Sequence, residues 1–123
     1  MADDTLRGLH VLVVEDEYML AEDLRTSLED AGVEIVGPVG RLQAALDAIR
    51  SAPELDAAVV DVNLGGEMAY PVADLLRERG VPFVFATGYD DSMIPPRFSG
   101  VARCEKPVDF HKVVGALERA MHA

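Results

Sequence analysis

The stretch "VLVVEDE" (residues 11–17) joins four apolar residues to three consecutive carboxylates. An uninterrupted apolar run is typical of a strand that is covered on both faces, as strands in parallel sheets are. Neighbouring carboxylates repel one another, because two unit charges about 4 Å apart interact by about 4 kcal/mol at an effective dielectric of 20. The stretch therefore predicts a buried strand that ends at a charged site, where a cation relieves the repulsion.

Short apolar runs alternate with amphipathic segments along the rest of the chain. Asp109 is suited to cap the last amphipathic segment as a helix. The expected strands are residues 10–14, 34–39, 56–62, 82–87 and 101–106, and the expected helices are 18–31, 41–51, 70–79 and 109–122. Because parallel strands need crossover connections and helices supply them, the alternation predicts an α/β fold with a doubly wound parallel sheet.

The fourth connection, "GYDDSMIPPRFSG" (88–100), differs from the others. Its two consecutive prolines remove amide donors and clash with a continuing helix, so we expect a short or irregular helix there. The 123 residues, half of them hydrophobic, suffice for one packed core. We therefore expect residues 1–123 to form a single domain without an output domain.

Composition excludes several classes of function. The net charge of -11 opposes binding to nucleic acid, whose affinity for proteins depends on Lys and Arg. The start of the chain has no basic segment followed by an apolar core, and no apolar run is long enough to cross a bilayer. We expect a cytoplasmic protein that contacts neither membrane nor nucleic acid. The single cysteine, Cys104, excludes an internal disulfide and is expected to be buried.

Chemistry-bearing residues follow four of the five expected strands. Glu15 and Asp16 follow the first strand, Asp61 the third, Thr87 the fourth and Lys106 the fifth. In a parallel sheet these strand ends share one edge, where ligands of such folds bind. The residues are therefore expected to converge although they are far apart in sequence.

This combination indicates a site that accepts a phosphoryl group. Lys106 supplies one positive charge, and the carboxylate oxygens are the hard ligands that Mg²⁺ prefers. A metal, a lysine and a hydroxyl would neutralise charge on the phosphoryl oxygens while a carboxylate oxygen attacks in line. Asp61 is the expected nucleophile.

Taken singly, most of these residues also have ordinary structural explanations. Asp16 or Glu17 could cap the following helix, Thr87 could be a β-branched strand residue, and Lys106 could be a surface lysine in a turn. Asp61 is the exception, because a carboxylate that ends an apolar run is costly to bury without a partner.

Four motifs, in this order, carry a family resemblance: "VLVVEDE" (11–17), "VVDVNLGG" (59–66), "FATG" (85–88) and "EKP" (105–107). Over essentially its full length the chain resembles the receiver domain of two-component response regulators, in particular stand-alone receivers with a Phe-Ala-Thr-Gly run. The resemblance implies a flavodoxin-like (βα)5 fold with strand order 2-1-3-4-5.

The resemblance also implies a mechanism. Asp61 would take a phosphoryl group from a histidine kinase or a histidine phosphotransfer protein. Mg²⁺ would be held by Asp16, Asp61 and the carbonyl of Asn63, with Glu15 acting through water.

Thr87 and Lys106 would hold the phosphoryl oxygens, as the resemblance further implies. Such a protein is not an enzyme with a separate substrate, but it catalyses its own phosphorylation and dephosphorylation. It would signal through contacts with a separate target protein, or serve as a phosphate sink.

The switch residues depart from the family pattern. Receivers commonly carry an aromatic residue shortly before the lysine, whose ring moves inward with the threonine; Arg103 occupies that place here. Tyr89 could supply the missing ring, so Thr87, Tyr89 and Arg103 are the candidates for a switch.

The sequence disfavours three other functions. An aspartyl phosphatase of the haloacid dehalogenase type needs an acid two residues after its nucleophile, where this chain has Asn63, which cannot exchange a proton at neutral pH. A pseudo-receiver that never carries phosphate is disfavoured because Asp16, Asp61, Thr87 and Lys106 are all present. A flavin domain needs a Ser-, Thr- and Gly-rich phosphate loop, and no strand here is followed by one.

Overall fold

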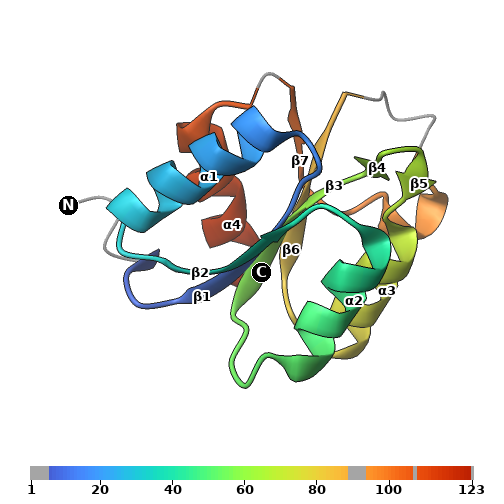
Figure 1. Cartoon of the computed structure of the whole chain (residues 1–123), viewed down its shortest axis with the longest axis horizontal. Coiled ribbons are helices and arrows are strands. Elements are labelled where there is room, and N and C mark those ends of the chain that lie inside the picture. The colour runs from blue at the N-terminus through green and yellow to red at the C-terminus, as the bar shows by residue number, and fades with distance from the viewer. Residues whose placement is uncertain (1–5, 89–93, 107, 123) are drawn as a thin grey trace.

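A five-stranded parallel sheet forms the centre of the protein, in a computed structural model that describes residues 6–88, 94–106 and 108–122. Its strands, in spatial order, are β2 (Glu34–Val39), β1 (His10–Val14), β3 (Ala57–Asp61), β6 (Phe83–Thr87) and β7 (Arg103–Glu105). These strands correspond to the expected order 2-1-3-4-5, so the predicted doubly wound fold is confirmed (Figure 1).

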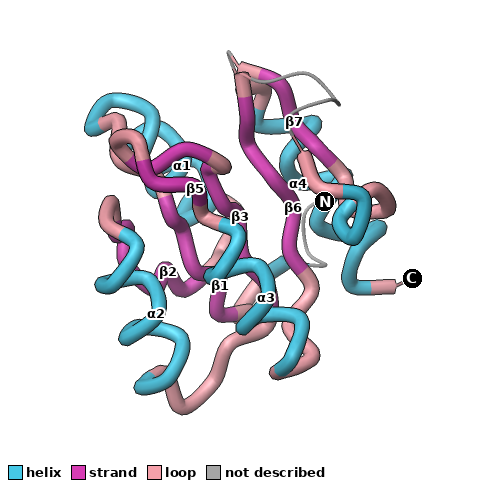
Figure 2. Tube along the Cα trace, turned by 90° about the vertical axis from the view of Figure 1, so that its right-hand side faces the viewer, coloured by secondary structure: helices cyan, strands magenta, loops and turns pink. Residues whose placement is uncertain are grey.

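Helices cover both faces of the sheet. One face carries α1 (Tyr18–Asp30) and α4 (Phe110–Met121), and the other carries α2 (Leu42–Ser51) and α3 (Tyr70–Glu78) (Figures 1 and 2). Each helix begins and ends within about one residue of its predicted bounds, because its apolar positions recur at helical spacing. Asp109 caps α4 as expected, since its side chain accepts a hydrogen bond of 2.8 Å from the amide of His111.

The core divides into two layers because side chains alternate along each strand. Leu12 and Val14 of β1 point to the α2/α3 layer, whereas Val11 and Val13 point to the α1/α4 layer. All four side chains are buried. The continuous apolar run of the sequence is therefore explained by a strand that packs on both faces.

Two connections depart from simple strand-to-helix turns. Residues after β3 form a small antiparallel hairpin, β4 (Asn63–Leu64) and β5 (Glu67–Met68), which the sequence reasoning did not predict. Gly65 and Gly66 at its turn have φ of 62° and 101°, which non-glycine residues rarely adopt. In the fourth connection the described part contains a short 3-10 helix, η3 (Pro96–Phe98), as the double proline predicted; residues 89–93 lie outside the described residues.

Side-chain contacts attach η3 to α3. Arg97 binds both carboxylate oxygens of Asp74, at 3.1 and 3.0 Å, and Arg77 donates a hydrogen bond of 2.7 Å to the carbonyl of Arg97. Both guanidinium groups lie over the buried ring of Phe98. The end of the fourth connection is thereby held against the α2/α3 side of the sheet.

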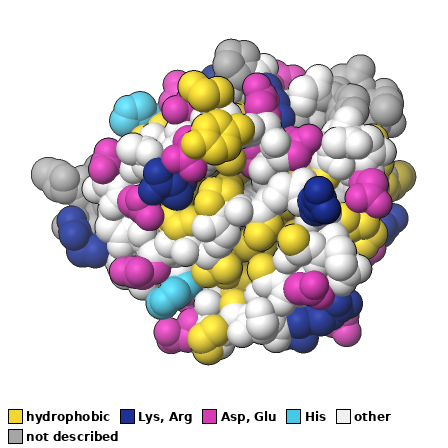
Figure 3. Space-filling view, in the orientation of Figure 1, with side chains coloured by type: hydrophobic (Ala, Val, Ile, Leu, Met, Phe, Trp, Pro, Cys, Tyr) yellow, Lys and Arg dark blue, Asp and Glu magenta, His cyan; other side chains and the backbone are white. Residues whose placement is uncertain are grey.

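The surface on the face that Figure 3 shows is mixed in character. Acidic and basic side chains are interspersed around an apolar band that lies over the edge strand β2, between α1 and α2. Cys104 is buried on β7, as expected. Within the described ranges, none of the helices has the length and apolar character needed to cross a bilayer.

Candidate functional site

The carboxyl ends of β1, β3, β6 and β7 bring the predicted site residues to one edge of the sheet. Glu15 and Asp16 directly follow β1, whereas Asp61 and Thr87 are the last residues of β3 and β6. Lys106 directly follows β7, and its amide donates to the carbonyl of Thr87 at 3.1 Å. The parallel ladder sets this arrangement, since it pairs Asp61 with Ala86 and Thr87 with Glu105.

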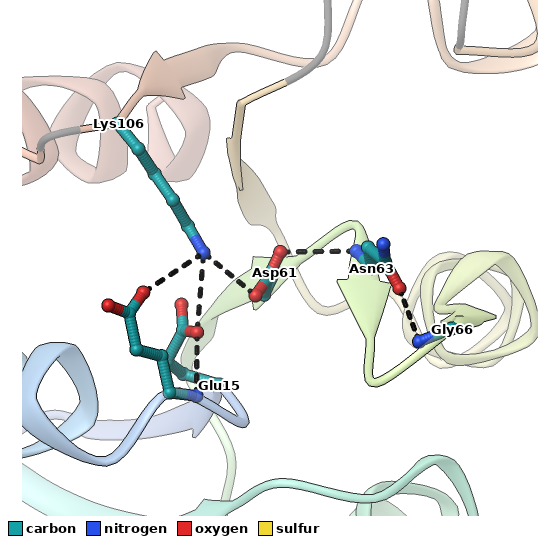
Figure 4. A network of polar contacts seen from close by, with 6 residues as sticks. Glu15, Asp61, Asn63, Gly66 and Lys106 are labelled. Carbon is teal, nitrogen blue, oxygen red and sulfur yellow. Dashed lines mark hydrogen bonds and ion pairs between the residues drawn. The ribbon is translucent and has the colours of Figure 1, made fainter.

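Lys106 is the centre of a network of carboxylates (Figure 4). Its Nζ lies 3.0 Å from Oδ2 of Asp61 and 3.3 Å from Oε2 of Glu15. A third carboxylate, Glu17, approaches Nζ at 3.9 Å from the exposed rim of the site. One ammonium group therefore offsets only part of the negative charge of the site.

Glu15 is a buried carboxylate that lacks full compensation. Its Oε2 accepts hydrogen bonds from Lys106 and from the amide of Glu17, at 3.3 and 3.1 Å. Its Oε1 is buried and has no hydrogen-bond partner among the described residues. Burial, together with the adjacent Asp61 carboxyl group, raises the pKa of Glu15 to about 8.

The charge of Lys106 is stabilised by the same network. Partial burial by itself disfavours the ammonium form, but the hydrogen bond and negative charge of Asp61, with a further contribution from Glu15, outweigh it. The pKa of Lys106 is consequently raised, so the network favours the charged ammonium form.

Three carboxylates meet the chemical requirements of a magnesium site. Glu15, Asp16 and Asp61 each offer an oxygen, and these oxygens lie within 4.8 Å of one another. Glu15 and Asp61 are buried, while Asp16 is open to solvent. Mg²⁺ prefers a few carboxylates together with water molecules, so the donor set and the unpartnered Oε1 of Glu15 fit this ion.

Asn63 is held close to Asp61 by the hairpin. Its amide donates to Oδ1 of Asp61 at 3.1 Å, and its side-chain oxygen accepts from the amide of Gly66 at 2.7 Å (Figure 4). The carboxylate of Asp61 is thus fixed on one side by Asn63 and on the other by Lys106. The side chain of Asn63 is engaged in closing the turn.

The switch candidates are placed differently from one another. Thr87 is buried at the end of β6, next to the Lys106 segment. Arg103 is exposed on β7 and lines a hollow against α4. Tyr89 lies outside the described residues.

Two features of the site were not predicted. The contact of Glu17 with Lys106 was not predicted, because the sequence offers Glu17 only as a residue at the start of the following helix. The hairpin that positions Asn63 was also not predicted, although the pair Gly65-Gly66 is a known signal for a tight turn.

Known structures resemble this fold and, in part, this sequence. The solution structure of SdrG from Sphingomonas melonis Fr1 is 38% identical, with 89% of this chain and 96% of that chain covered and a TM-score of 0.77. The BeF3-activated conformation of SdrG from Pseudomonas melonis Fr1 is 39% identical, with 91% and 95% covered and a TM-score of 0.75.

Two further structures carry the receiver name. The signal receiver domain of a modulated diguanylate cyclase from Desulfovibrio desulfuricans G20 is 28% identical, with 92% of this chain and 93% of that chain covered and a TM-score of 0.76. A response regulator receiver protein from Sinorhizobium medicae WSM419 has the same fold, at 23% identity, coverages of 94% and 95% and a TM-score of 0.79. No family model and no curated protein matches the sequence.

The chain belongs to the receiver domains of response regulators. The resemblance to receiver domains inferred from the four motifs is thereby confirmed, whereas the assignment to a subgroup with a Phe-Ala-Thr-Gly run stays a prediction. Membership of this family supports a phosphoacceptor role for the receiver.

Proposed function

We propose that Asp61 accepts a phosphoryl group from a phosphohistidine of a histidine kinase or a histidine phosphotransfer protein, in a reaction that depends on Mg²⁺. One observation carries the proposal. The carboxylate of Asp61 ends a buried strand and lies 3.0 Å from Lys106, beside two further carboxylates that offer oxygens for a metal. A carboxylate held in this way combines a nucleophile with groups that neutralise an incoming phosphoryl group.

In the proposed reaction a carboxylate oxygen of Asp61 attacks phosphorus while the bond from phosphorus to the donor imidazole nitrogen breaks. The electron pair of that bond remains on the nitrogen. The three phosphorus–oxygen bonds of the transferred group stay intact. Lys106 and the hydroxyl of Thr87 would bind phosphoryl oxygens as charge moves onto them. Hydrolysis of the resulting aspartyl phosphate by water, in the same site, would return the free carboxylate.

The metal proposal follows from the donor set. Asp16, Asp61 and the carbonyl of Asn63 would hold Mg²⁺, and Glu15 would act through water. When bound, the ion would supply positive charge that offsets the phosphoryl oxygens and the carboxylates. The orphaned Oε1 of Glu15 supports this assignment, because a cation or its water would give that oxygen a partner.

The output is proposed to be a contact with another protein in the cytoplasm. A phosphoryl group adds about -1.5 to -2 units of charge and three strong acceptor oxygens. Lys106, which already lies 3.0 Å from Asp61, would bind these oxygens, and the hydroxyl of Thr87 would move toward them. Thr87 with either Tyr89 or Arg103 would transmit the change to the surface. A separate target protein could recognise the phosphorylated receiver. Alternatively, the receiver could act as a phosphate sink that removes phosphoryl groups from a kinase.

Beryllofluoride binding tests the proposal without a protein donor. This anion mimics a phosphoryl group on a carboxylate. A BeF3-activated conformation is known for SdrG, whose sequence is 39% identical to this chain. With Mg²⁺ present, we expect saturable shifts of the amide resonances of Asp61, Thr87 and Lys106.

The matched variants are Asp61→Asn and Asp47→Asn, the second of which changes an exposed carboxylate on α2. The shifts should vanish in the first variant and persist in the second. Equal shifts in Asp61→Asn would place the acceptor elsewhere, and no shifts in the wild type would favour a receiver that works without phosphate.

A further inference from the structure

The side chain of Glu17 does not cap the helix that it precedes. Glu17 is the N-cap residue of α1, yet its carboxylate accepts no capping hydrogen bond from the described residues of that helix. Helices are usually capped by Ser, Thr, Asp or Asn, whose short side chains reach the free amides of the first turn. Capping therefore does not explain where the carboxylate of Glu17 lies.

Glu17 is instead attached to the phosphoacceptor site. Its amide donates a hydrogen bond of 3.1 Å to Oε2 of the buried Glu15. Its side chain is 63% exposed and directs Oε1 toward Nζ of Lys106, at 3.9 Å. Glu17 thus lies at the mouth of the site, with its backbone held by Glu15 and most of its side chain in solvent.

The contact between Glu17 and Lys106 is electrostatic rather than a hydrogen bond. Hydrogen bonds from nitrogen to oxygen are about 2.7–3.2 Å long. The buried carboxylates of Asp61 and Glu15 lie close to this range, at 3.0 and 3.3 Å from Nζ, whereas Glu17 lies farther away. Glu17 therefore adds negative charge beside the ammonium group, and an exposed contact of this kind costs little to break.

This geometry places Glu17 beside the path of an incoming phosphoryl group. The proposed reaction requires Lys106 to bind phosphoryl oxygens, each of which would lie about 3 Å from Nζ. Because Oε1 of Glu17 lies 3.9 Å from the same atom, the two anions would be at most about 7 Å apart. Their charges are of the same sign, so Glu17 opposes the approach of an anionic donor.

The repulsion is large enough to select between phosphoryl donors. In water, two unit charges about 7 Å apart repel by an energy that corresponds to about a threefold change in rate. The penalty grows with the charge of the donor, so a dianion is slowed about threefold more than a monoanion. A protein donor can avoid the penalty, since it can place a cation against the carboxylate as it docks.

We propose that Glu17 is a charge gate, that is, a residue whose charge determines which phosphoryl donors reach Lys106. Its carboxylate repels small anionic donors, and it does so more strongly as their negative charge increases. The inference rests on the proposed phosphoryl transfer to Asp61, to which it adds a residue that selects the donor.

Two small donors of different charge test the gate. Acetyl phosphate is a dianion near pH 7, whereas phosphoramidate has a protonated nitrogen and one negative charge less. In both reactions an oxygen of Asp61 attacks phosphorus, the bond from phosphorus to the leaving group breaks, and acetate or ammonia departs with the electron pair. The measured quantity is the ratio of the two phosphorylation rates, acetyl phosphate over phosphoramidate, obtained from intact mass with Mg²⁺ at low salt.

Variants assign the ratio to Glu17. Glu17→Gln should raise it about threefold because the amide is neutral, and Glu17→Lys should raise it about tenfold because the charge is reversed. Asp23→Asn is the matched control, since it removes an exposed carboxylate from α1 about 9 Å farther along the helix axis, and it should leave the ratio unchanged. A role of Glu17 in the fold alone would change both rates together and not their ratio.

Salt provides an independent check of the same charge. The Debye length falls from about 30 Å at 0.01 M to about 8 Å at 0.15 M ionic strength. The ratio of the wild type should therefore rise with added salt, and that of Glu17→Gln should rise less.

The outcomes separate the gate from the phosphoacceptor proposal. An unchanged ratio in Glu17→Gln, or an equal rise in Asp23→Asn, would overturn the gate while phosphorylation of Asp61 stands. If neither donor modifies the wild type or the Glu17 variants, the proposal for Asp61 fails and the gate fails with it. Modification of Glu17→Gln by acetyl phosphate under conditions that leave the wild type unmodified would support the gate.

Discussion

Glu15 has the least favourable environment of the charged residues described at the site. It is buried beside Asp61, shares Lys106 with that residue, and keeps one oxygen without a partner among the described residues. In the metal-free protein these features favour the neutral carboxylic acid, because desolvation disfavours the charged form. The environment of Glu15 therefore lowers the stability of the metal-free fold, and a bound cation would relieve this cost.

The pKa of Glu15 predicts how metal-free stability depends on pH. The pKa is about 8 in the folded protein and 4.5 in the reference state, so the folded protein binds the extra proton between these values. Its contribution to stability is therefore present below pH 4.5 and is lost as the pH rises through 8. Urea denaturation in a chelator should show this loss in the wild type.

Replacement of the carboxyl group by an amide isolates the effect. Glu15→Gln cannot ionise, so its stability at pH 8 should exceed that of the wild type by about 1 kcal/mol or more, given 1.36 kcal/mol per pKa unit. Glu17→Gln removes an exposed carboxylate from the same site and should retain the wild-type pH profile. If Glu15→Gln lost as much stability as the wild type between pH 6 and pH 8, the assignment to Glu15 would be wrong.

The identity of the site residues could be read from the sequence, but their contacts could not. Asp61, Thr87 and Lys106 were expected together because parallel strands end at one edge, and the structure places them there. The direct bond between Lys106 and Glu15 depends on how far each side chain reaches and on their rotamers. The sequence pattern contains neither quantity.

At the scale of elements, the contact between α3 and η3 holds the last part of the fourth connection. Arg97 forms a bidentate pair with Asp74 and lies 4.6 Å from the centre of the Phe98 ring. Tyr70 stacks on the same ring from the start of α3. These contacts fix η3 against α3.

Removal of the Arg97 side chain should lower the free energy of unfolding modestly, and by more than removal of the Arg50 side chain. The side chain is about half exposed, so its paired hydrogen bonds and its contact with Phe98 contribute modestly. Arg50→Ala is the matched control, since Arg50 is equally exposed and meets Asp47 only at 3.8 Å. Chemical denaturation of both variants checks the prediction. Equal losses in the free energy of unfolding would show that the bidentate contact of Arg97 adds no stability beyond that of an ordinary exposed arginine.

The elements themselves were predictable wherever one periodicity extended over a whole segment. The four helices carry apolar residues at helical spacing, and β1, β3 and β6 are almost wholly apolar, so their bounds were predicted closely. The hairpin of β4 and β5 is too short to show a period. Its only signal is the glycine pair at the turn, which was interpreted as part of a phosphoacceptor motif instead.

At the scale of the whole molecule, the excess of negative charge makes the protein sensitive to cations. The net charge is -11, and three carboxylates gather at the site. A divalent cation that binds the folded state alone stabilises it by mass action. The carboxylate site and the net charge both predict that divalent cations stabilise the folded protein. A variant of the site separates specific binding from a general effect of charge.

Mg²⁺ should raise the melting temperature of the wild type by several degrees. At about ten times the dissociation constant, binding contributes about 1.4 kcal/mol, which corresponds to about 3–6 °C for a domain of this size. Calorimetry at matched ionic strength checks the value. Asp16→Asn should show a much smaller rise, and an equal rise in this variant would mean that Mg²⁺ acts through the general charge.

The central claim, that Asp61 is the phosphoacceptor, is tested most directly by intact mass. The protein is incubated with phosphoramidate and Mg²⁺, beside Asp61→Asn and a chelator control. The account predicts one phosphoryl adduct on the wild type and none on the variant or in chelator. An adduct that persists on Asp61→Asn, or a wild type that remains unmodified, would contradict it.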